Sequence, residues 1–363
     1  MEPVPSEFPA TGRVEGPFPA CASVAIIGGG LAGLATAWAL GERGFGDVVV
    51  LERDDDLAAQ ASGRNAAMCR ALAEDDAWTA LTAAGAKFLR QPPPGFARAP
   101  LVDDRGAVLL AGADLAAELA ARARRFAIAH APITAAEVGA RWPGLDVDRG
   151  GLFFPDDGVI DLAVLVEGYV TAARAAAVRI VTGAEVFGFT VGKGGVAVST
   201  ARGALHVQQV VIAAGAWADE VAARGGAPAL DLTSRRRHVV ALRARAPSAP
   251  IVWNVDGDEW YARPAGAEVW TSACDSDDVA AGVVDARLGA EAEARARVPA
   301  ALAIAPLARV WACQRTFAGG PPVVARDAAR PWLVRVVGLG GHGVTASAAV
   351  GRAAAAVVAG HQD

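Results

Sequence analysis

The chain has 363 residues, which is enough for two domains or one large one. It carries 34 basic and 39 acidic residues, a formal net charge of −5 and a single basic run at 235–237. A nucleic-acid partner is excluded, because duplex binding needs clustered positive charge. No stretch of 18 residues is apolar without a charge, so we expect no membrane span.

The first 22 residues hold three glutamates and five prolines, with no basic start and no apolar core. This composition predicts a disordered leader and not a secretory signal. The four cysteines form no CxxC pair and the five histidines are scattered, so we expect no disulfide framework and no metal site. We therefore expect a cytoplasmic protein.

An apolar strand, a glycine turn and a helix follow the leader. Val24 to Ile27 is typical of a buried parallel strand, and residues 34–40 predict a helix. Between them Gly28, Gly30 and Gly33 have the GxGxxG spacing. They serve, in order, for the tight turn, for close approach to a pyrophosphate and for helix–strand packing. The N-terminus of the helix can then face the phosphates.

A second strand at 47–51 ends at Glu52, which lies 19 residues after Gly33. An acid at this place binds the ribose hydroxyls of a dinucleotide and repels a 2′-phosphate. The first 53 residues therefore predict a dinucleotide site that disfavours NADP.

The segment 60–68 indicates which dinucleotide is bound. Its sequence Gln-Ala-Ser-Gly-Arg-Asn-Ala-Ala-Met is small and polar, and can thread between a diphosphate and a ring system. It resembles the Ala-Ser-Gly-x-Asn-Ala segment of the D-amino-acid oxidase and glycine oxidase superfamily of FAD enzymes. The resemblance implies FAD as the cofactor.

The middle of the chain carries two more segments of this superfamily. Residues 153–161 resemble its Pro-x-Asp-Gly-x-x-Asp stretch, and 210–218 its Val-Val-x-Ala-x-Gly-Ala-Trp strand and turn. Between them we expect a helix at 162–177, a strand at 178–181, an edge that meets adenine through Val186, and a hairpin from 196–200 and 204–207. Gly215 permits close approach to the dinucleotide.

A second glycine turn closes the chain. A strand at 332–337 leads to Gly338-Leu339-Gly340-Gly341-His342-Gly343, and a helix is predicted from Val344 to Ala359. The N-terminal amides of this helix should face the N1–C2=O edge of the flavin, where negative charge grows on reduction. Thr345 could add a hydroxyl contact, and His342 is expected beside the ring or the substrate.

These segments predict an α/β fold in which an FAD-binding Rossmann-like (glutathione-reductase-type) domain is interleaved with an antiparallel-sheet substrate domain. We assign residues 23–88, 150–230 and 312–363 to the FAD-binding domain and 89–149 and 231–311 to the substrate domain. Strands expected at 239–242, 251–255 and 268–272 should form one sheet that caps the flavin. The predicted cofactor residues are Gly28, Gly30, Leu31, Ala32, Gly33, Glu52, Arg53, Ser62, Gly63, Arg64, Asn65, Ala66, Ala67, Met68, Val186, Ala214, Gly215, Trp217, Cys313, Gly340, Gly341, His342, Gly343, Val344 and Thr345.

Within the superfamily the chain resembles bacterial D-arginine dehydrogenase-like enzymes. Their substrate-binding arginine, in a Trp-Ala-Gly-x-Arg string, falls on Arg315, and their substrate tyrosine falls on Tyr261. A second arginine of the group falls on Arg237. A planar guanidinium pairs bidentately with a carboxylate, and so fixes the direction of the Cα–H bond.

The chain also departs from this group. The acid that would hold a guanidinium side chain falls near Ala107, the tyrosine lid near Ala73, and an active-loop histidine near Met68. The pocket should therefore not prefer D-arginine. Cys313 replaces a glycine, and in the monomeric sarcosine oxidase branch a cysteine at the matching place bonds to the flavin. The alternative is a small buried cysteine beside the ring.

The resemblance implies an FAD-dependent D-amino-acid dehydrogenase or oxidase. It would transfer hydride from Cα to flavin N5, giving an imino acid that water hydrolyses to a 2-keto acid and ammonia, with oxygen or a quinone as electron acceptor. Arg315, Tyr261, Arg237 and His342 are the predicted catalytic residues. An FAD oxidase of secondary amines such as sarcosine, glycine or proline derivatives, a tailoring oxidase, and a non-catalytic flavin-binding subunit stay open.

Overall fold

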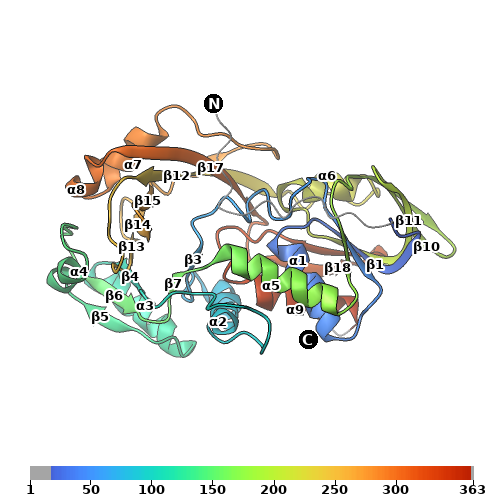
Figure 1. The fold of residues 1–363 in the computed structure, drawn as a ribbon, viewed down its shortest axis with the longest axis horizontal. Coiled ribbons are helices and arrows are strands. Elements are labelled where there is room, and N and C mark those ends of the chain that lie inside the picture. Colours follow the sequence, from blue (N-terminus) through green and yellow to red (C-terminus); the bar gives the residue numbers. More distant parts are fainter. Residues whose placement is uncertain (1–17, 361–363) are drawn as a thin grey trace.

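The computed structural model describes residues 18–360 and holds two large sheets that lie side by side (Figure 1). Residues 1–17 of the predicted leader lie outside the described residues, as do 361–363. The first strand, β1, begins at Cys21, two residues inside the segment expected to be leader. The backbone N–H of His206 donates to the carbonyl of Ala20, which ties this start to the sheet.

The first sheet has eight strands in the order β18-β19-β11-β1-β2-β8, with β9 and β10 added as a hairpin on β11. Its strands are β1 (Cys21–Ile27), β2 (Val48–Leu51), β8 (Arg179–Val181), β9 (Val186–Gly192), β10 (Gly195–Thr200), β11 (Gly203–Ile212), β18 (Val323–Asp327) and β19 (Arg330–Val337). The pairs β2–β8, β1–β2, β1–β11 and β11–β19 are parallel, as the near-continuous apolar runs of these strands predict.

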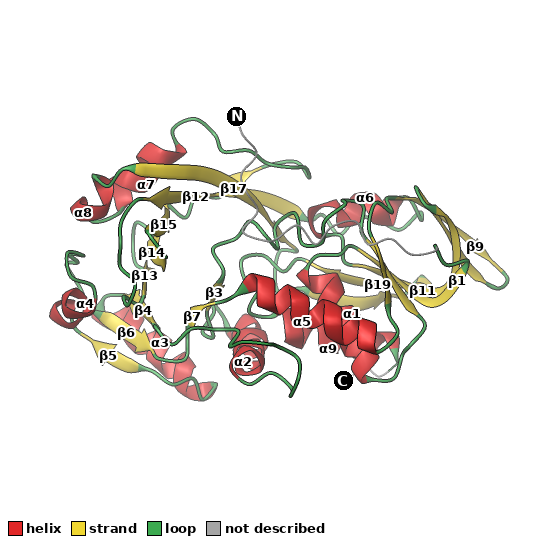
Figure 2. Ribbon diagram, in the orientation of Figure 1, coloured by secondary structure: helices red, strands yellow, loops and turns green. Residues whose placement is uncertain are grey.

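Both faces of this sheet are buried. Alternate residues of β1 point to opposite faces, so Val24 and Ile26 enter one core while Ala25 and Ile27 enter another. Helices cover the first face, and the hairpin β9–β10 with a short helix covers the second (Figure 2). The helices of the first face are α1 (Leu31–Glu42), α2 (Asp76–Arg90), α5 (Leu162–Ala175) and α9 (Ser347–Val358), and α6 (Ala218–Ala223) lies on the second.

The second sheet has nine strands in the order β16-β12-β15-β14-β13-β4-β6-β5, with β17 paired to β12. They are β4 (Ala107–Leu110), β5 (Ala131–Ile133), β6 (Gly151–Phe154), β12 (Thr233–Leu242), β13 (Ile251–Asn254), β14 (Trp260–Ala265), β15 (Glu268–Ser272), β16 (Asp277–Asp278) and β17 (Leu307–Phe317). The helices that accompany it are α3 (Ala113–Arg125), α4 (Ala135–Arg141), α7 (Ala290–Arg297) and α8 (Ala300–Ala303). A small third sheet pairs β3 (Met68–Cys69) with β7 (Gly158–Val159).

The fold class is confirmed by this arrangement, with two differences in detail. The pair β13–β4 is parallel, whereas the other pairs described in the second sheet are antiparallel. In addition, β6 and residues 312–317 of β17 belong to the second sheet, although the sequence assigns both to the FAD-binding domain. The domain borders themselves stay predictions.

Two further elements differ from expectation. The strand expected at 204–207 and the strand expected at the start of 210–218 form one continuous ten-residue strand, β11. Its first half pairs with β10, and most of it, from His206 to Ile212, also pairs with β1. The last helix begins at Ser347 and not at Val344, because residues 340–346 form turns that start at Gly340, where φ is +52°.

Candidate functional site

The first glycine turn has the close packing that its spacing predicts. Gly28 has φ of +113°, and a Cβ on Gly33 would lie 1.9 Å from the carbonyl oxygen of Gly28. Only glycine allows α1 to approach β1 this closely. No acidic residue lies in the first turn of α1, so its N-terminal amides favour an anion.

Glu52 lies at the end of β2, beside this turn. Its Oε2 accepts a hydrogen bond from the backbone N–H of Gly29 at 2.6 Å, and its Oε1 accepts one from Asp54 at 2.9 Å. Burial raises the pKa of Glu52, and the two backbone hydrogen bonds oppose that rise. The carboxylate therefore stays close to the glycine turn, where the sequence places the ribose.

The 60–68 segment folds against the start of α1. Ser62 Oγ accepts from the backbone N–H of Leu31 at 3.0 Å. Asn65 holds the segment itself: its Nδ2 donates to the carbonyl of Ser62 at 2.7 Å, and its Oδ1 accepts from Ala67 N at 2.7 Å. Ala67 has φ of +51°, so this side chain supports a strained backbone.

One long pocket joins the two glycine turns. Of the predicted cofactor residues, those lining it are Gly28, Gly30, Leu31, Ala32, Glu52, Arg53, Ser62, Arg64, Asn65, Val186, Ala214, Gly215, Trp217, Cys313, Gly340, Gly341, Gly343 and Val344, and the predicted catalytic residue Arg315 lines it too. Arg53 lies over the Trp217 ring, 3.8 Å from its centre, at the end of the pocket near Glu52. Both sheets thus contribute walls to one pocket.

Some predicted residues lie behind this lining. Gly33, Gly63, Ala66, Ala67, Met68, Thr345 and His342 are not part of the pocket wall, and neither are the predicted catalytic residues Arg237 and Tyr261. The Thr345 hydroxyl is used within the chain, because it donates to the carbonyl of Met68 at 3.2 Å and accepts from Arg70 N at 3.3 Å. It fixes β3 against the second glycine turn.

His342 points away from the pocket, although its two neighbours in the chain, Gly341 and Gly343, line the pocket. Its Nε2 lies 2.6 Å from Glu74 Oε2, and its ring packs on Trp78 with 5.0 Å between centres. Partial desolvation of the otherwise exposed Glu74 opposes ionisation, but the hydrogen bond from His342 and the charge of Arg70 outweigh it and lower the pKa of this carboxyl. In this arrangement His342 anchors the glycine turn to α2.

The other three predicted catalytic residues come together on one face of the second sheet; we call them the arginine–tyrosine cluster (Arg237, Tyr261 and Arg315). Arg237 on β12 pairs with Cys313, two residues before Arg315 on β17. Burial and the charge of Arg315 lower the pKa of Arg237. Burial raises the pKa of Tyr261, and the charges of both arginines oppose that rise. The registers of β17, β12, β15 and β14 place the three residues on the same face of the sheet.

The cluster has unused hydrogen-bonding capacity. Arg237 Nε donates to the carbonyl of Asp275 at 2.6 Å. The buried Arg237 Nη1 and the buried Tyr261 hydroxyl have no partner among residues 18–360. Within the same residues Arg315 makes no ion pair. Buried guanidinium and hydroxyl groups without partners are costly, and an anionic ligand would satisfy them.

Sequence reasoning missed part of the pocket wall. Gly282 and Val284 reach it from the loop between β16 and α7. Gln314, which lies beside the predicted Arg315, holds this loop: its Nε2 donates to the Ala280 carbonyl at 2.7 Å, and its Oε1 accepts from Gly282 N at 3.3 Å. Nothing in the loop sequence signals this contact, because it depends on the fold.

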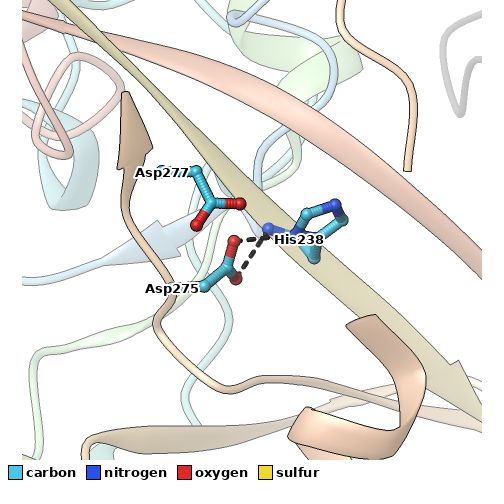
Figure 3. A group of neighbouring side chains, drawn as sticks. All are labelled: His238, Asp275 and Asp277. Atoms are coloured by element: carbon cyan, nitrogen blue, oxygen red, sulfur yellow. Dashed lines mark hydrogen bonds and ion pairs between the residues drawn. The ribbon is translucent and has the colours of Figure 1, made fainter. Parts of the chain in front are cut away.

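The base of this loop holds a histidine and two aspartates that resemble a metal site (Figure 3). His238 Nδ1 lies 2.7 Å from Asp275 Oδ2, while His238 Nε2 accepts from the backbone N–H of Arg287 at 3.0 Å. Asp277 Oδ2 pairs with Arg287 Nε at 2.8 Å and with Arg236 at 3.3 Å. Since both imidazole nitrogens and one oxygen of Asp277 already have partners in the chain, the group serves to anchor the loop.

The pocket residues fit FAD. The first glycine turn suits a diphosphate, because the N-terminus of α1 behind it has no acidic residue in its first turn. Glu52 beside the turn suits a ribose. Cys313, Arg315 and the second glycine turn line the far end, where the missing side chain of Gly341 lets the Arg315 guanidinium lie against the backbone: a Cβ there would be 3.1 Å from it.

No helix within residues 18–360 combines the length and apolar character needed to cross a bilayer.

Solved structures share this fold over nearly the whole chain. Glycine oxidase from Geobacillus kaustophilus is 21% identical, with a TM-score of 0.81 over 94% of this chain and 96% of that one. L-proline dehydrogenase from P. horikoshii is 19% identical, with a TM-score of 0.85 over 95% and 96%. At these identities the likeness shows the fold alone.

A curated relative matches a shorter part. The tRNA 5-methylaminomethyl-2-thiouridine biosynthesis bifunctional protein MnmC from Ectopseudomonas mendocina (strain ymp) is 37% identical over 142 residues, which are 37% of this chain and 20% of that protein. The chain thus matches about a fifth of the relative's length.

A family model described as FAD dependent oxidoreductase (DAO) matches residues 23–357. This range contains both glycine turns, the whole pocket and the arginine–tyrosine cluster. The specific similarity to D-arginine dehydrogenase-like enzymes stays a prediction. The chain belongs to the DAO family of FAD-dependent oxidoreductases.

Proposed function

We propose that the chain oxidises the amine of an α-amino acid, in line with the D-amino-acid reading of the sequence. The observation that carries this proposal is the arginine–tyrosine cluster: Arg315 lines the pocket beside Cys313, and on the same sheet face the buried Arg237 and Tyr261 have donors with no partner among the described residues. Two guanidinium groups and a hydroxyl are suited to one carboxylate. The relatives' names, glycine oxidase and L-proline dehydrogenase, agree with an amino-acid substrate.

In this proposal FAD supplies the acceptor of the hydride from Cα. Arg315 holds the substrate carboxylate, with Tyr261 and Arg237 as further donors, and this fixes the direction of Cα–H. Holding the reacting atoms in line is the main contribution of the protein in such a reaction. The imino acid leaves the site and is hydrolysed by water to a 2-keto acid and ammonia.

The test is the visible spectrum of the FAD-loaded protein, recorded anaerobically before and after adding D-, L-, N-methyl and cyclic amino acids. We expect bleaching by a subset of primary amino acids. Recovery of the colour with air or with a quinone then identifies the electron acceptor. A flavin spectrum that no amino acid changes contradicts the proposal and favours a non-catalytic flavin subunit.

The Arg315→Met variant should lose transition-state stabilisation of about 2–5 kcal/mol, or about 30-fold to several thousand-fold in kcat/KM. Arg309→Met is its matched control: Arg309 lies on the same strand but pairs with Glu268 at 3.3 Å, and we expect its kinetics to match the wild type.

A second candidate is an FAD oxidase of secondary amines. It is favoured by Cys313, which is buried, lines the pocket and stands where the sarcosine oxidase branch has its flavin-linked cysteine. Bleaching by N-methyl or cyclic amines alone would support it, and so would flavin that stays with the chain after acid precipitation.

A further inference from the structure

A carboxylate shares the sheet face of the arginine–tyrosine cluster. Glu259 immediately precedes β14, and side chains two residues apart on a strand point to the same face, so Glu259 lies on the face of Tyr261. The neighbours Trp260 and Ala262 point the opposite way, into a separate core. Sequence reasoning did not single out Glu259.

Glu259 is held in place by the next strand. Trp253 Nε1 donates to Glu259 Oε1 at 2.9 Å. Trp253 pairs directly with Tyr261 across β13 and β14, and the two rings meet edge to face with 5.6 Å between centres. This hydrogen bond and ring contact fix the glutamate beside the tyrosine.

The charges near Glu259 are not paired with it. Its carboxylate acts electrostatically on both Arg237 and Arg315, opposing the loss of their protons, yet no guanidinium within residues 18–360 forms an ion pair with it. Two positive groups and one negative group therefore lie on one face of the sheet, with no ion pair between them among the described residues. This is complementary to a zwitterion, with its carboxylate at the arginines and its ammonium at the glutamate.

We propose that Glu259 binds the amino group of the substrate and accepts its proton. An N–H bond of the ammonium breaks, its electron pair stays on nitrogen, and an O–H bond forms on the carboxylate. The neutral amine then holds the lone pair that forms the C=N bond as hydride leaves Cα. This step rests on the proposed function and adds a catalytic residue to it.

The charged and titratable groups near Glu259 come from several elements of the second sheet. Arg237 on β12 and Arg315 on β17 bring positive charge, and Arg297 of α7 donates to the Glu259 backbone carbonyl at 3.2 Å. Burial raises the pKa of the Cys274 thiol to about 12 and also raises that of Tyr261, so both stay neutral near pH 7. A hydrogen bond to the Glu259 carboxylate also contributes to the raised pKa of the Cys274 thiol.

The test uses the FAD-loaded Glu259→Gln variant, whose amide oxygen can still accept from Trp253. Two probes are compared: an amino acid that reduces the wild-type flavin, and the matching carboxylic acid without its amino group, whose binding is read from the change in flavin absorbance. We expect the rate of anaerobic flavin reduction near neutral pH to fall by about 100-fold or more, and its rise with pH to shift to higher pH. Binding of the carboxylic acid should be unchanged or tighter.

Glu268→Gln is the matched control. Glu268 also accepts from a tryptophan of this sheet, Trp270 Nε1, at 3.0 Å, but it pairs with Arg309 and not with the cluster. We expect it to keep wild-type rates and binding. Glu259→Asp keeps the carboxylate and should restore part of the rate and the wild-type pH profile.

Wild-type rates and an unchanged pH profile in Glu259→Gln overturn the inference, as does equal weakening of both probes. These results leave the proposed function standing if the wild-type flavin is bleached. A wild-type flavin that no amino acid reduces overturns the proposed function, and this inference with it.

Discussion

Tyr261 and Tyr169 are the two tyrosines of the chain, and both are fully buried, but their hydroxyls differ. The Tyr169 hydroxyl lies 2.9 Å from Ser347 Oγ, between α5 and α9. The Tyr261 hydroxyl has no partner among residues 18–360. A buried hydroxyl without a hydrogen bond costs about 1–3 kcal/mol. The proposed role of Tyr261 as a donor to the substrate carboxylate accounts for this cost, because the ligand would supply the missing hydrogen bond.

The Tyr261→Phe variant should unfold at a higher denaturant concentration than the wild type, with a gain of about 1 kcal/mol in unfolding free energy, because an unsatisfied polar group is removed. Its KM for the substrate should rise. Tyr169→Phe, which loses a hydrogen bond, should be less stable with unchanged KM. Loss of stability in both variants would contradict a free Tyr261 hydroxyl.

Single residues were predictable to different degrees. Arg315 and Tyr261 lie in recognisable strings, and the structure brings them together with Arg237. Glu259 reaches the same face only because β12, β15 and β14 pair in register, which the local sequence does not encode. His342 has the right neighbours in sequence, but the turn directs its side chain to Glu74 and Trp78.

At the scale of elements, the contact between β1 and α1 depends on Gly33. A Cβ there would lie 1.9 Å from the carbonyl oxygen of Gly28, which is backbone and cannot turn aside. The Gly33→Ala variant should lose about 1–3 kcal/mol or more in stability and most of its FAD. The flavin absorbance per protein and the melting temperature measure both effects. Gly192→Ala, where a Cβ meets nothing within 4 Å, is the control that should bind FAD normally.

The small sheet β3–β7 carries a buried acid. Asp157 Oδ1 accepts from the backbone N–H of Ala71 at 3.0 Å, and Oδ2 has no partner among the described residues. Burial raises the pKa of Asp157 from 3.8 to about 7, although this hydrogen bond and the charges of Arg70 and Arg90 oppose the rise. The ionised form is thus disfavoured in the folded state.

Because the folded pKa is the higher one, the stabilising contribution of the protonated carboxyl is complete below pH 3.8 and is lost as the pH rises through about 7. Wild-type unfolding free energy should therefore decline relative to Asp157→Asn between about pH 4 and pH 8. Denaturant titrations across this range measure the difference. Asp156→Asn removes an exposed neighbouring charge that makes the smallest contribution to this rise, so its curve should stay close to that of the wild type; parallel curves for the wild type and Asp157→Asn would refute the prediction.

Most strands and helices of the first sheet could be predicted from the local sequence, because buried parallel strands appear as apolar runs and the turns after them as glycine motifs. The exceptions arise from tertiary contacts. Gln208 and Gln209 interrupt the apolar pattern, yet β11 continues through them because β1 pairs alongside it. The start of α9 is delayed by the turns at 340–346, where the Thr345 hydroxyl bonds to the backbone of β3. Neither contact is visible in the local sequence.

On the scale of the whole molecule, the cofactor pocket joins the two sheets. Glu52 and the first glycine turn come from one sheet, whereas Cys313, Arg315 and the loop at Gly282 come from the other. FAD should therefore stabilise both: at 100 times its Kd, bound ligand adds about 2.7 kcal/mol. ADP at the same multiple of its own Kd contacts only the walls from the first sheet. It should therefore stabilise that sheet more than the second, and the two should melt less cooperatively than with FAD. Thermal melts of the stripped protein with each ligand test this, and identical, single transitions with ADP would contradict it.

The strand order of the first sheet also dictates when the pocket can exist. β1 and β2 flank the first glycine turn and its helix in sequence, but β19, which pairs with β11, begins at Arg330, 297 residues after Gly33. At a synthesis rate of about 5–20 residues per second, the second glycine turn is made on the order of 15–60 s after the first. During that interval the edge of β11 that β19 will cover is exposed, and exposed strand edges promote aggregation. The complete pocket, which both glycine turns line, can therefore form only after β19 and the turn that follows it have been synthesised.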